Sequence, residues 1–202
     1  AQADRVATHA LSLYDQTRGL LHQDSGGGRL LLWAAAQLHA CGKHINVGAY
    51  HKHSWYLIRH GELLGYSEHE HLMVAAIARY HRRSLPKKRH EAWQLIEGRE
   101  ERRTVAEMAL LLRLAVALER RPLPVLAGLR ALPLGQASSP TGILIRLLPQ
   151  QADNTRGELM DLGLECWSLR SCASTVAEAC GLELQVQEGA ETLMGALETQ
   201  AS

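Results

Sequence analysis

Histidine side chains gather in one part of this chain. Eight of the eleven histidines lie between His39 and His81. A neutral imidazole binds a divalent metal through a ring nitrogen, and a protonated imidazole attracts phosphate oxygens. The clustering therefore predicts a metal or phosphate site, and the residues beside the histidines decide between these two kinds of chemistry.

The pair His39 and Ala40 stands where a histidine followed by an aspartate would hold a divalent metal at a helix end. Such a metal lowers the pKa of bound water, so that the water attacks a phosphate. The methyl group of Ala40 offers no metal ligand, and the candidate oxygen ligands nearby are Glu62, Glu68 and Glu70. These glutamates fall in or beside a predicted loop and an exposed helix start. We therefore expect a degenerate position that holds no metal.

Cationic side chains around this pair suit an anion better than a metal. Lysine supplies a point charge, and arginine supplies a planar fork that matches phosphate oxygens. Each histidine alone would more often be a satisfied core or cap residue, and only its placement beside lysine and arginine favours a ligand. The predicted phosphate-binding residues are Lys43, His51, Lys52, His53, Arg79, His81, Arg82 and Arg83.

No sequence pattern points to a catalytic residue. The chain has no Gly-x-Ser-x-Gly elbow, and the glycines at 26–28 precede Arg29 instead of the Lys-Ser/Thr pair of a P-loop. Cys41 stands two residues after His39, and a helix turns such neighbours to different sides. Nucleophilic catalysis therefore has little support.

Charge is unevenly distributed although the net charge is only +1. Residues 79–121 carry twelve Lys and Arg against six Asp and Glu, whereas residues 151–202 carry two against nine. This asymmetry favours a basic face for an anionic partner and an acidic end that stays away from it. Aromatic residues make up only 4% of the chain, too few for stacking platforms, so nucleic acid is not an expected partner.

Helices are expected to dominate the first part of the chain. Phe is absent, so Leu and Ala must fill most of the core, which favours helices over β-sandwiches. Ser67 and Glu70 form a capping-box pattern at the start of one helix. The glycines at 26–28 predict a turn. Apolar periodicity predicts further helices over 3–19, 29–41 with its end at Gly42, 52–60, a short stretch within 87–101, and 104–120.

The periodicity changes after Pro122 and Pro124. Short strands are expected over 129–135, 142–148 and 182–186, with one helix over 155–180 and a frayed or disordered tail after Gly189. Cys166, Cys172 and Cys180 would lie on that single helix as reduced thiols, typical of a cytoplasmic protein. No apolar run reaches the ~18 residues that span a membrane. We predict a mainly α fold, with a helical unit over 1–125 and a small α+β unit over 126–202.

A series of short stretches between residues 6 and 83 carries a resemblance to a known family. The stretches are Val6-Ala7, Ala10-Leu11, Leu13-Tyr14-Asp15, Leu38-His39, Gly42-Lys43, His51-Lys52-His53-Ser54, Tyr56-Leu57-Ile58, Leu64-Gly65-Tyr66-Ser67 and Ala78-Arg79-Tyr80-His81-Arg82-Arg83. In order and spacing they resemble the C-terminal half of the exopolyphosphatase/guanosine pentaphosphate phosphohydrolase (Ppx/GppA) family. Two positions depart from the family pattern. Ala40 replaces the acid of the His-Asp pair, and the histidine expected just before Val6 is missing.

The resemblance implies that residues 1–125 form an HD-type helical domain. It also implies that the parent protein carries its phosphatase chemistry, with Mg²⁺, in an N-terminal actin-like domain. This chain would then bind polyphosphate or guanosine pentaphosphate, support a homodimer and need no cofactor. The chain starts at Ala1 without an initiator Met, so we expect a part of a longer protein that is not catalytic by itself.

Two alternatives stay open at this point. The chain could be a self-sufficient, metal-dependent HD-type phosphohydrolase with an unusual ligand set. It could also be a purely structural dimerisation module. Stoichiometric metal in the purified protein, together with turnover that a chelator stops, would favour the metal-dependent enzyme. Ligand binding that does not change when the basic residues are substituted would favour the dimerisation module.

Overall fold

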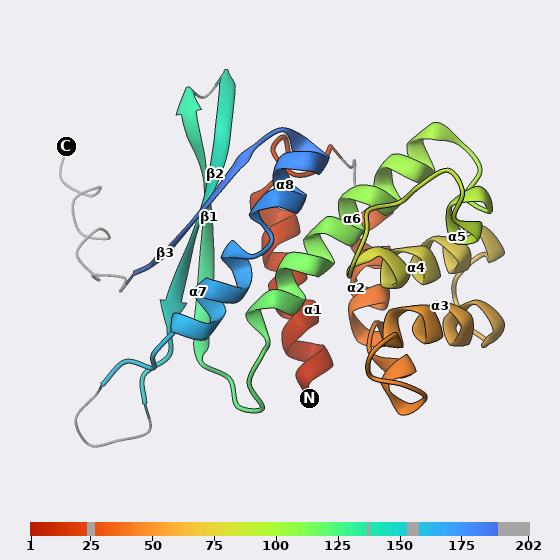
Figure 1. Ribbon diagram of the computed structural model, residues 1–202, viewed down its shortest axis with the longest axis horizontal. Coiled ribbons are helices and arrows are strands. Elements are labelled where there is room, and N and C mark those ends of the chain that lie inside the picture. The colour runs from red at the N-terminus through yellow and green to blue at the C-terminus, as the bar shows by residue number, and fades with distance from the viewer. Residues whose placement is uncertain (24–26, 137, 153–157, 190–202) are drawn as a thin grey trace.

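The computed structural model describes residues 1–23, 27–136, 138–152 and 158–189. Helices dominate up to residue 118, and a small sheet with two more helices follows (Figure 1). The predicted class, a helical part followed by a small α+β part, is confirmed. The helical part consists of α1 (Gln2–Gln16), α2 (Gly27–Leu38), the 3₁₀ turn η1 (Cys41–His44), α3 (Tyr50–His60), α4 (Glu68–Tyr80), α5 (Glu91–Gln94) and α6 (Arg99–Leu118).

Helix α6 is the element that the two parts share. Its residues 108–112 are at most 2% exposed, because α1, α2 and α4 pack against it from the helical part and α7 and α8 from the other. Figure 1 shows the sheet at one end of the molecule, α3 to α5 at the other, and α1 and α6 between them. A site between the two parts must therefore use α6 as a wall.

The start of α4 follows the capping-box prediction. The hydroxyl of Ser67 accepts from the amide of Glu70 at 3.3 Å, and the Glu70 carboxylate accepts from the amide of Ser67 at 2.8 Å. The helix then buries residues 73–78 and Tyr80. This apolar run fixes the helix in the core and so determines where the basic residues after Tyr80 emerge.

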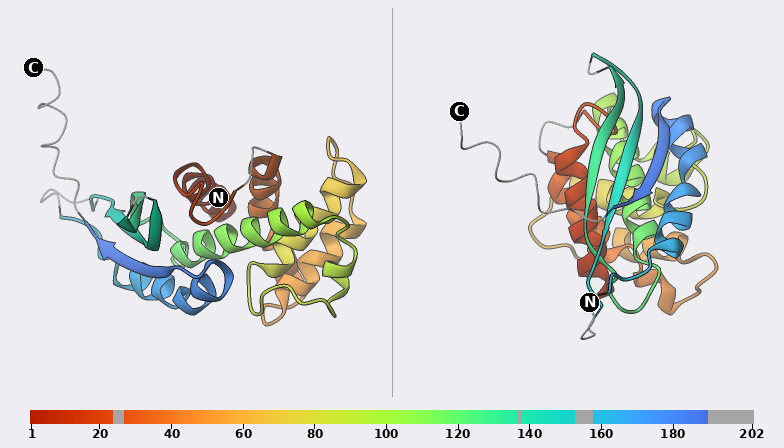
Figure 2. Two further views of the ribbon diagram at one scale, coloured as in Figure 1. Left: turned by 90° about the horizontal axis from the view of Figure 1, so that it is seen from above. Right: turned by 90° about the vertical axis from the view of Figure 1, so that its left-hand side faces the viewer.

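The sheet has the order β1-β2-β3, with β1 (Leu126–Gln136) antiparallel to β2 (Ser139–Pro149) and β3 (Glu183–Glu188) parallel to β2. Ile143, Ile145 and Leu147 alternate along β2 and are fully buried. Helices α7 (Gly163–Arg170) and α8 (Ala173–Cys180) form the crossover from β2 to β3 and pack against β3 (Figure 2). The three predicted strands are confirmed, each somewhat longer than expected or shifted by a residue or two.

The single helix predicted over 155–180 is wrong, because it divides into α7 and α8. The hydroxyl of Ser171 donates to the carbonyl of Ser168 at 2.6 Å. This bond competes with the helical ladder, and the chain turns there. Cys166 therefore lies on α7, and Cys172 and Cys180 lie at the two ends of α8.

Several other helix boundaries differ from the prediction, and α6 begins at Arg99 instead of Thr104. Helix α2 ends at Leu38 instead of Gly42, because the hydroxyl of Ser54 on α3 takes over the carbonyl of His39. Gly27 and Gly28 begin α2 and do not form a turn. Predictions for residues 24–26, 153–157 and the tail beyond 189 lie outside the described residues. In the part of the chain that is described, no helix has both the length and the apolarity to traverse a membrane.

Candidate functional site

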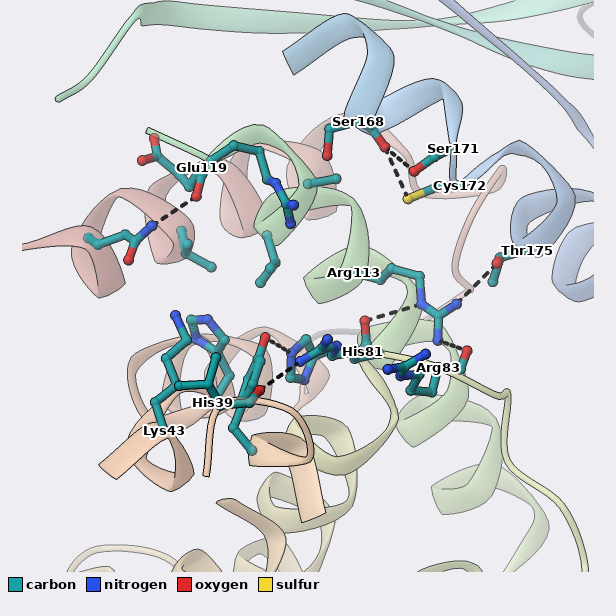
Figure 3. Close-up of a pocket in the computed structure, with 18 residues that line it drawn as sticks. His39, Lys43, His81, Arg83, Arg113, Glu119, Ser168, Ser171, Cys172 and Thr175 are labelled. Atoms are coloured by element: carbon teal, nitrogen blue, oxygen red, sulfur yellow. Dashed lines mark hydrogen bonds between the residues drawn. The ribbon is translucent and has the colours of Figure 1, made fainter. Parts of the chain in front are cut away.

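A cavity of about 490 Å³ opens where the helical part meets α7 and α8 (Figure 3). Its size falls in the range of small-ligand sites. Basic side chains from η1, the end of α4 and α6 line it together with hydroxyl groups from the α7–α8 pair. The polar and charged lining residues are Gln2, His39, Lys43, Tyr50, His81, Arg82, Arg83, Arg113, Glu119, Arg120, Ser168, Ser171 and Thr175.

Close packing of η1 against α3 brings Lys43 to the cavity. A Cβ on Gly42 would collide with the backbone of Tyr50 and Ser54, so only glycine fits there. The amide of Gly42 donates to the Ser54 hydroxyl at 3.0 Å, and this hydroxyl donates to the carbonyl of His39 at 2.7 Å. Glycine at position 42 therefore permits the close packing that places the next residue, Lys43, at the cavity.

Tyr50 lies between two cations at the cavity wall. The ammonium of Lys43 is 5.3 Å and the guanidinium of Arg82 is 4.9 Å from its ring centroid, which are cation–π distances. Its hydroxyl lies 2.9 Å from Nε2 of His81. Burial raises the pKa of Tyr50. The ring therefore stays neutral and keeps both cations at the cavity.

His39 and His81 occupy matching positions just after α2 and α4. Nδ1 of His39 lies 2.7 Å from the carbonyl of Ala36, and Nδ1 of His81 lies 2.6 Å from the carbonyl of Ala78. A carbonyl only accepts, so each Nδ1 carries the proton. Burial lowers the pKa of both histidines, that of His81 well below 6.5. Both nitrogens of His81 are thus engaged, and its role is to hold Tyr50 in place.

The eight predicted phosphate-binding residues fall into two groups. Lys43, His81, Arg82 and Arg83 line the cavity. The other four, His51, Lys52, His53 and Arg79, do not line it.

In the second group, Lys52 and Arg79 act on the ring of His51. This ring is buried with Nδ1 unpartnered, and burial together with Arg79, Arg82, Lys52 and Arg83 lowers its pKa to about 4. A group that resists protonation adds no positive charge for phosphate at neutral pH. Lys52 is exposed, His53 and Arg79 are half-buried, and the Arg79 guanidinium lies 5.6 Å from the centroid of the Tyr80 ring.

Sequence reasoning missed the cavity residues of α6 and of the α7–α8 pair. Arg113 could have been identified from the sequence, because it interrupts the apolar run 108–118. An arginine within an apolar helix face needs polar partners. Arg120 lay inside the basic stretch but was not singled out. Ser168, Ser171 and Thr175 carry no local signal, because only the crossover of the sheet brings them to α6.

Glu119 contributes a carboxylate to the cavity lining, and this carboxylate is already paired. Nε of Arg5 lies 2.7 Å from Oε2, and Nε2 of His9 lies 3.0 Å from Oε1. Burial alone would raise the pKa of Glu119, but the bonds from His9 and Arg5 outweigh it, and the pKa is lowered. Gln2 also donates to the backbone carbonyl of Glu119 at 2.8 Å. Helix α1 is thereby tied to the end of α6.

Residues 1–125 match the model of the family described as Ppx/GppA phosphatase, domain III. The chain belongs to the Ppx/GppA phosphatase family. The guanosine-5'-triphosphate,3'-diphosphate pyrophosphatase of Pseudoalteromonas translucida (strain TAC 125) is 40% identical over 86 residues, which cover 43% of this chain and 17% of that protein. The protein of the same name from Pseudoalteromonas atlantica is 33% identical over 84 residues, 42% of this chain and 17% of that protein. The resemblance inferred from the sequence is confirmed.

The donor atoms of this Ppx/GppA chain do not fit a Mg²⁺ ion near His39. Mg²⁺ demands oxygen ligands in octahedral geometry. The carboxylate of Glu70 caps α4, and Glu62 and Glu68 are exposed and absent from the cavity lining. Among the described residues no group of three or more His, Cys, Asp or Glu side chains is arranged to hold a metal. The prediction that no metal binds here remains a prediction.

Proposed function

We propose that this chain is the polyanion-binding C-terminal region of a Ppx/GppA phosphohydrolase, and that its cavity holds phosphate groups of polyphosphate or guanosine pentaphosphate. The observation that carries the proposal is the charge balance of the cavity. Lys43, Arg82, Arg83 and Arg120 line it, whereas Glu119 is neutralised by Arg5. Such an excess of positive charge in a concave site attracts phosphate oxygens.

The second group of predicted residues extends this cationic region beyond the cavity. Arg79, Arg82, Lys52 and Arg83 all act on His51, and Lys87 and Arg89 act with Arg79 and Lys52 on His90. A chain-like polyanion that leaves the cavity past Arg83 would therefore meet further positive charge. This arrangement supports a substrate with several phosphates in series.

Catalysis belongs, in this proposal, to an actin-like N-terminal domain of the parent protein, where Mg²⁺ would act. The share of 17% that the matched segment has in its relatives supports a role as one part of a larger protein. A helical domain over 1–125, an α+β subdomain over 126–202 and a homodimer belong to the same proposal. All four cysteines are free thiols, which supports a reducing, cytoplasmic location.

Calorimetric titration with linear polyphosphate of defined length, and separately with guanosine pentaphosphate, tests the proposal. Four cation–phosphate contacts predict an affinity loss on the order of 50-fold between about 50 and about 200 mM salt. Arg82→Gln and Lys43→Met should each weaken binding about tenfold, because a charge-assisted bond is lost. Arg103→Gln is the matched control, because Arg103 lies outside the cavity lining and, among the described residues, pairs with Glu100 and Glu107 of its own helix.

Three outcomes would overturn the proposal. Absence of binding at low salt, or binding that ignores salt, would exclude a cationic site. Binding unaffected by Arg82→Gln would favour a structural dimerisation module. Stoichiometric metal in the purified chain with chelator-sensitive phosphatase turnover would favour a self-sufficient metal-dependent phosphohydrolase.

A further inference from the structure

We propose that Arg113 is a positioning residue that couples α8 to the basic turn, residues 81–83. Through this coupling the position of α8 determines the affinity of the cavity for anions. This inference rests on the proposed function. In this inference Arg113 changes the affinity for the anion without a direct bond to the anion.

Arg113 binds the backbone at the end of α4. Its Nε donates to the carbonyl of His81 at 3.1 Å, and its Nη2 donates to the carbonyl of Arg83 at 2.7 Å (Figure 3). Nη2 also donates to the carbonyl of Tyr80 at 3.2 Å. The last carbonyls of a helix lack partners within the helix and carry its negative dipole end. A guanidinium fork from α6 therefore satisfies and fixes this helix end.

The basic turn needs such a fixation because Arg83 is strained. Its φ is +68°, and no other described residue except glycine has a positive φ. A residue with a Cβ is disfavoured in this left-handed region. The shortest bond of Arg113 goes to the carbonyl of this same residue. In this turn Arg82 lies over the ring of Tyr50, so the strained backbone is what directs a cation at the cavity.

The other side of the Arg113 guanidinium reaches the C-terminal part of the chain. Nη1 donates to Oγ1 of Thr175 on α8 at 3.0 Å. Four of the five N–H groups of Arg113 thus have partners inside the protein. A fork used in this way cannot also bind phosphate through two bonds, so its function is to transmit the position of α8 to the turn.

Thr175→Val is the sharpest test, because valine keeps the shape of threonine and removes the hydroxyl that accepts from Arg113. We expect the Kd for linear polyphosphate to rise about fivefold, as for the loss of one net hydrogen bond. Thr141→Val is the matched control, because its hydroxyl donates to the carbonyl of Leu134 on the neighbouring strand, and Thr141 does not line the cavity. Arg113→Lys, which keeps the charge and loses the fork, should weaken binding about tenfold or more. Arg103→Lys on the same helix is its control.

The variant Arg83→Gly distinguishes a positioning role of Arg113 from a general effect of Thr175→Val on stability. Glycine adopts a positive φ without strain. In the Arg83→Gly background the turn no longer depends on Arg113, so Thr175→Val should change the Kd less than twofold. A stability effect alone would persist in this background.

The possible results are distinguishable. If the chain binds no polyphosphate, the proposed function fails. If Arg82→Gln weakens binding while Thr175→Val and Arg113→Lys bind like the unsubstituted chain, the proposed function stands and the coupling is refuted. The coupling would also be refuted if Thr175→Val raised the Kd by the same factor in the unsubstituted chain and in the Arg83→Gly background.

Discussion

The hydroxyl of Tyr50 donates a hydrogen bond of 2.9 Å to Nε2 of His81. Nδ1 of the same ring donates to the carbonyl of Ala78, so the neutral tautomer of His81 is fixed from both sides. The bond joins the start of α3 to the end of α4. Lys43 and Arg82 both make cation–π contacts with the Tyr50 ring, so this bond fixes the ring on which the two cations rest.

Tyr50→Phe tests the contact directly. Phenylalanine keeps the ring and both cation–π contacts, but it leaves Nε2 of His81 buried without a donor. We expect the free energy of unfolding to fall by about 1–3 kcal/mol, measured by urea denaturation at neutral pH. Tyr56→Phe on the exposed side of α3 is the control. Equal stability of Tyr50→Phe and the unsubstituted chain would contradict this reading.

Gly42→Ala should be strongly destabilising. The added Cβ meets backbone atoms of Tyr50 and Ser54, and backbone cannot rotate away as a side chain can. Overpacking of this kind costs about 1–3 kcal/mol. Gly27→Ala is the matched control, because in the described part of the chain no atom outside its own helix backbone and chain neighbours lies within 4 Å of the position of its Cβ. Thermal unfolding of both variants should show a clear loss for position 42 and none for position 27.

Much of the fold could be predicted because the signals were local. The capping box at Ser67 and Glu70 and the change of period after Pro124 follow from residues near in sequence. The break at Ser171 was not predicted, because a serine within a helical pattern does not by itself indicate that its hydroxyl will bond to the backbone and interrupt the helix, as that of Ser171 does at Ser168. Neighbours on a helix lie about 100° apart, which is why His51 turns inward and Lys52 faces solvent although both were assigned to one site. The partners of Arg113 are remote in sequence and became visible only in the fold.

Stability should rise with pH between pH 5 and pH 7 through His51. Burial lowers its pKa from 6.5 to about 4, so in this range the unfolded chain binds more protons than the folded chain. The slope of stability against pH is therefore positive, and the full loss at lower pH approaches about 3 kcal/mol. Burial shifts the pKa values of His39 and His81 in the same direction.

Urea denaturation at several pH values measures this slope, and His51→Gln should reduce it. A loss of stability in His51→Gln that is the same at every pH does not change this slope. A slope that His51→Gln leaves unchanged would show that this ring is protonated equally well in the folded and unfolded chain.

Glu119→Gln should loosen α1 from the end of α6. The amide keeps the shape of the carboxylate but loses the charge that Arg5 and His9 contact, and we expect a loss of about 1.5–3 kcal/mol. Because the pKa of Glu119 is lowered on folding, this contribution is present above its ordinary pKa of 4.5 and is lost as the pH falls through the folded value.

The difference in stability between the unsubstituted chain and Glu119→Gln should therefore be large at pH 7 and shrink in acid. Glu100→Gln removes a surface pair with Arg103 and should change stability by less than about 1 kcal/mol at either pH. Since Glu119 also lines the cavity, its neutralisation removes a negative charge from the lining. Polyphosphate should then bind Glu119→Gln at least as tightly as the unsubstituted chain, and weaker binding would show that the carboxylate organises the cationic site instead of merely facing it.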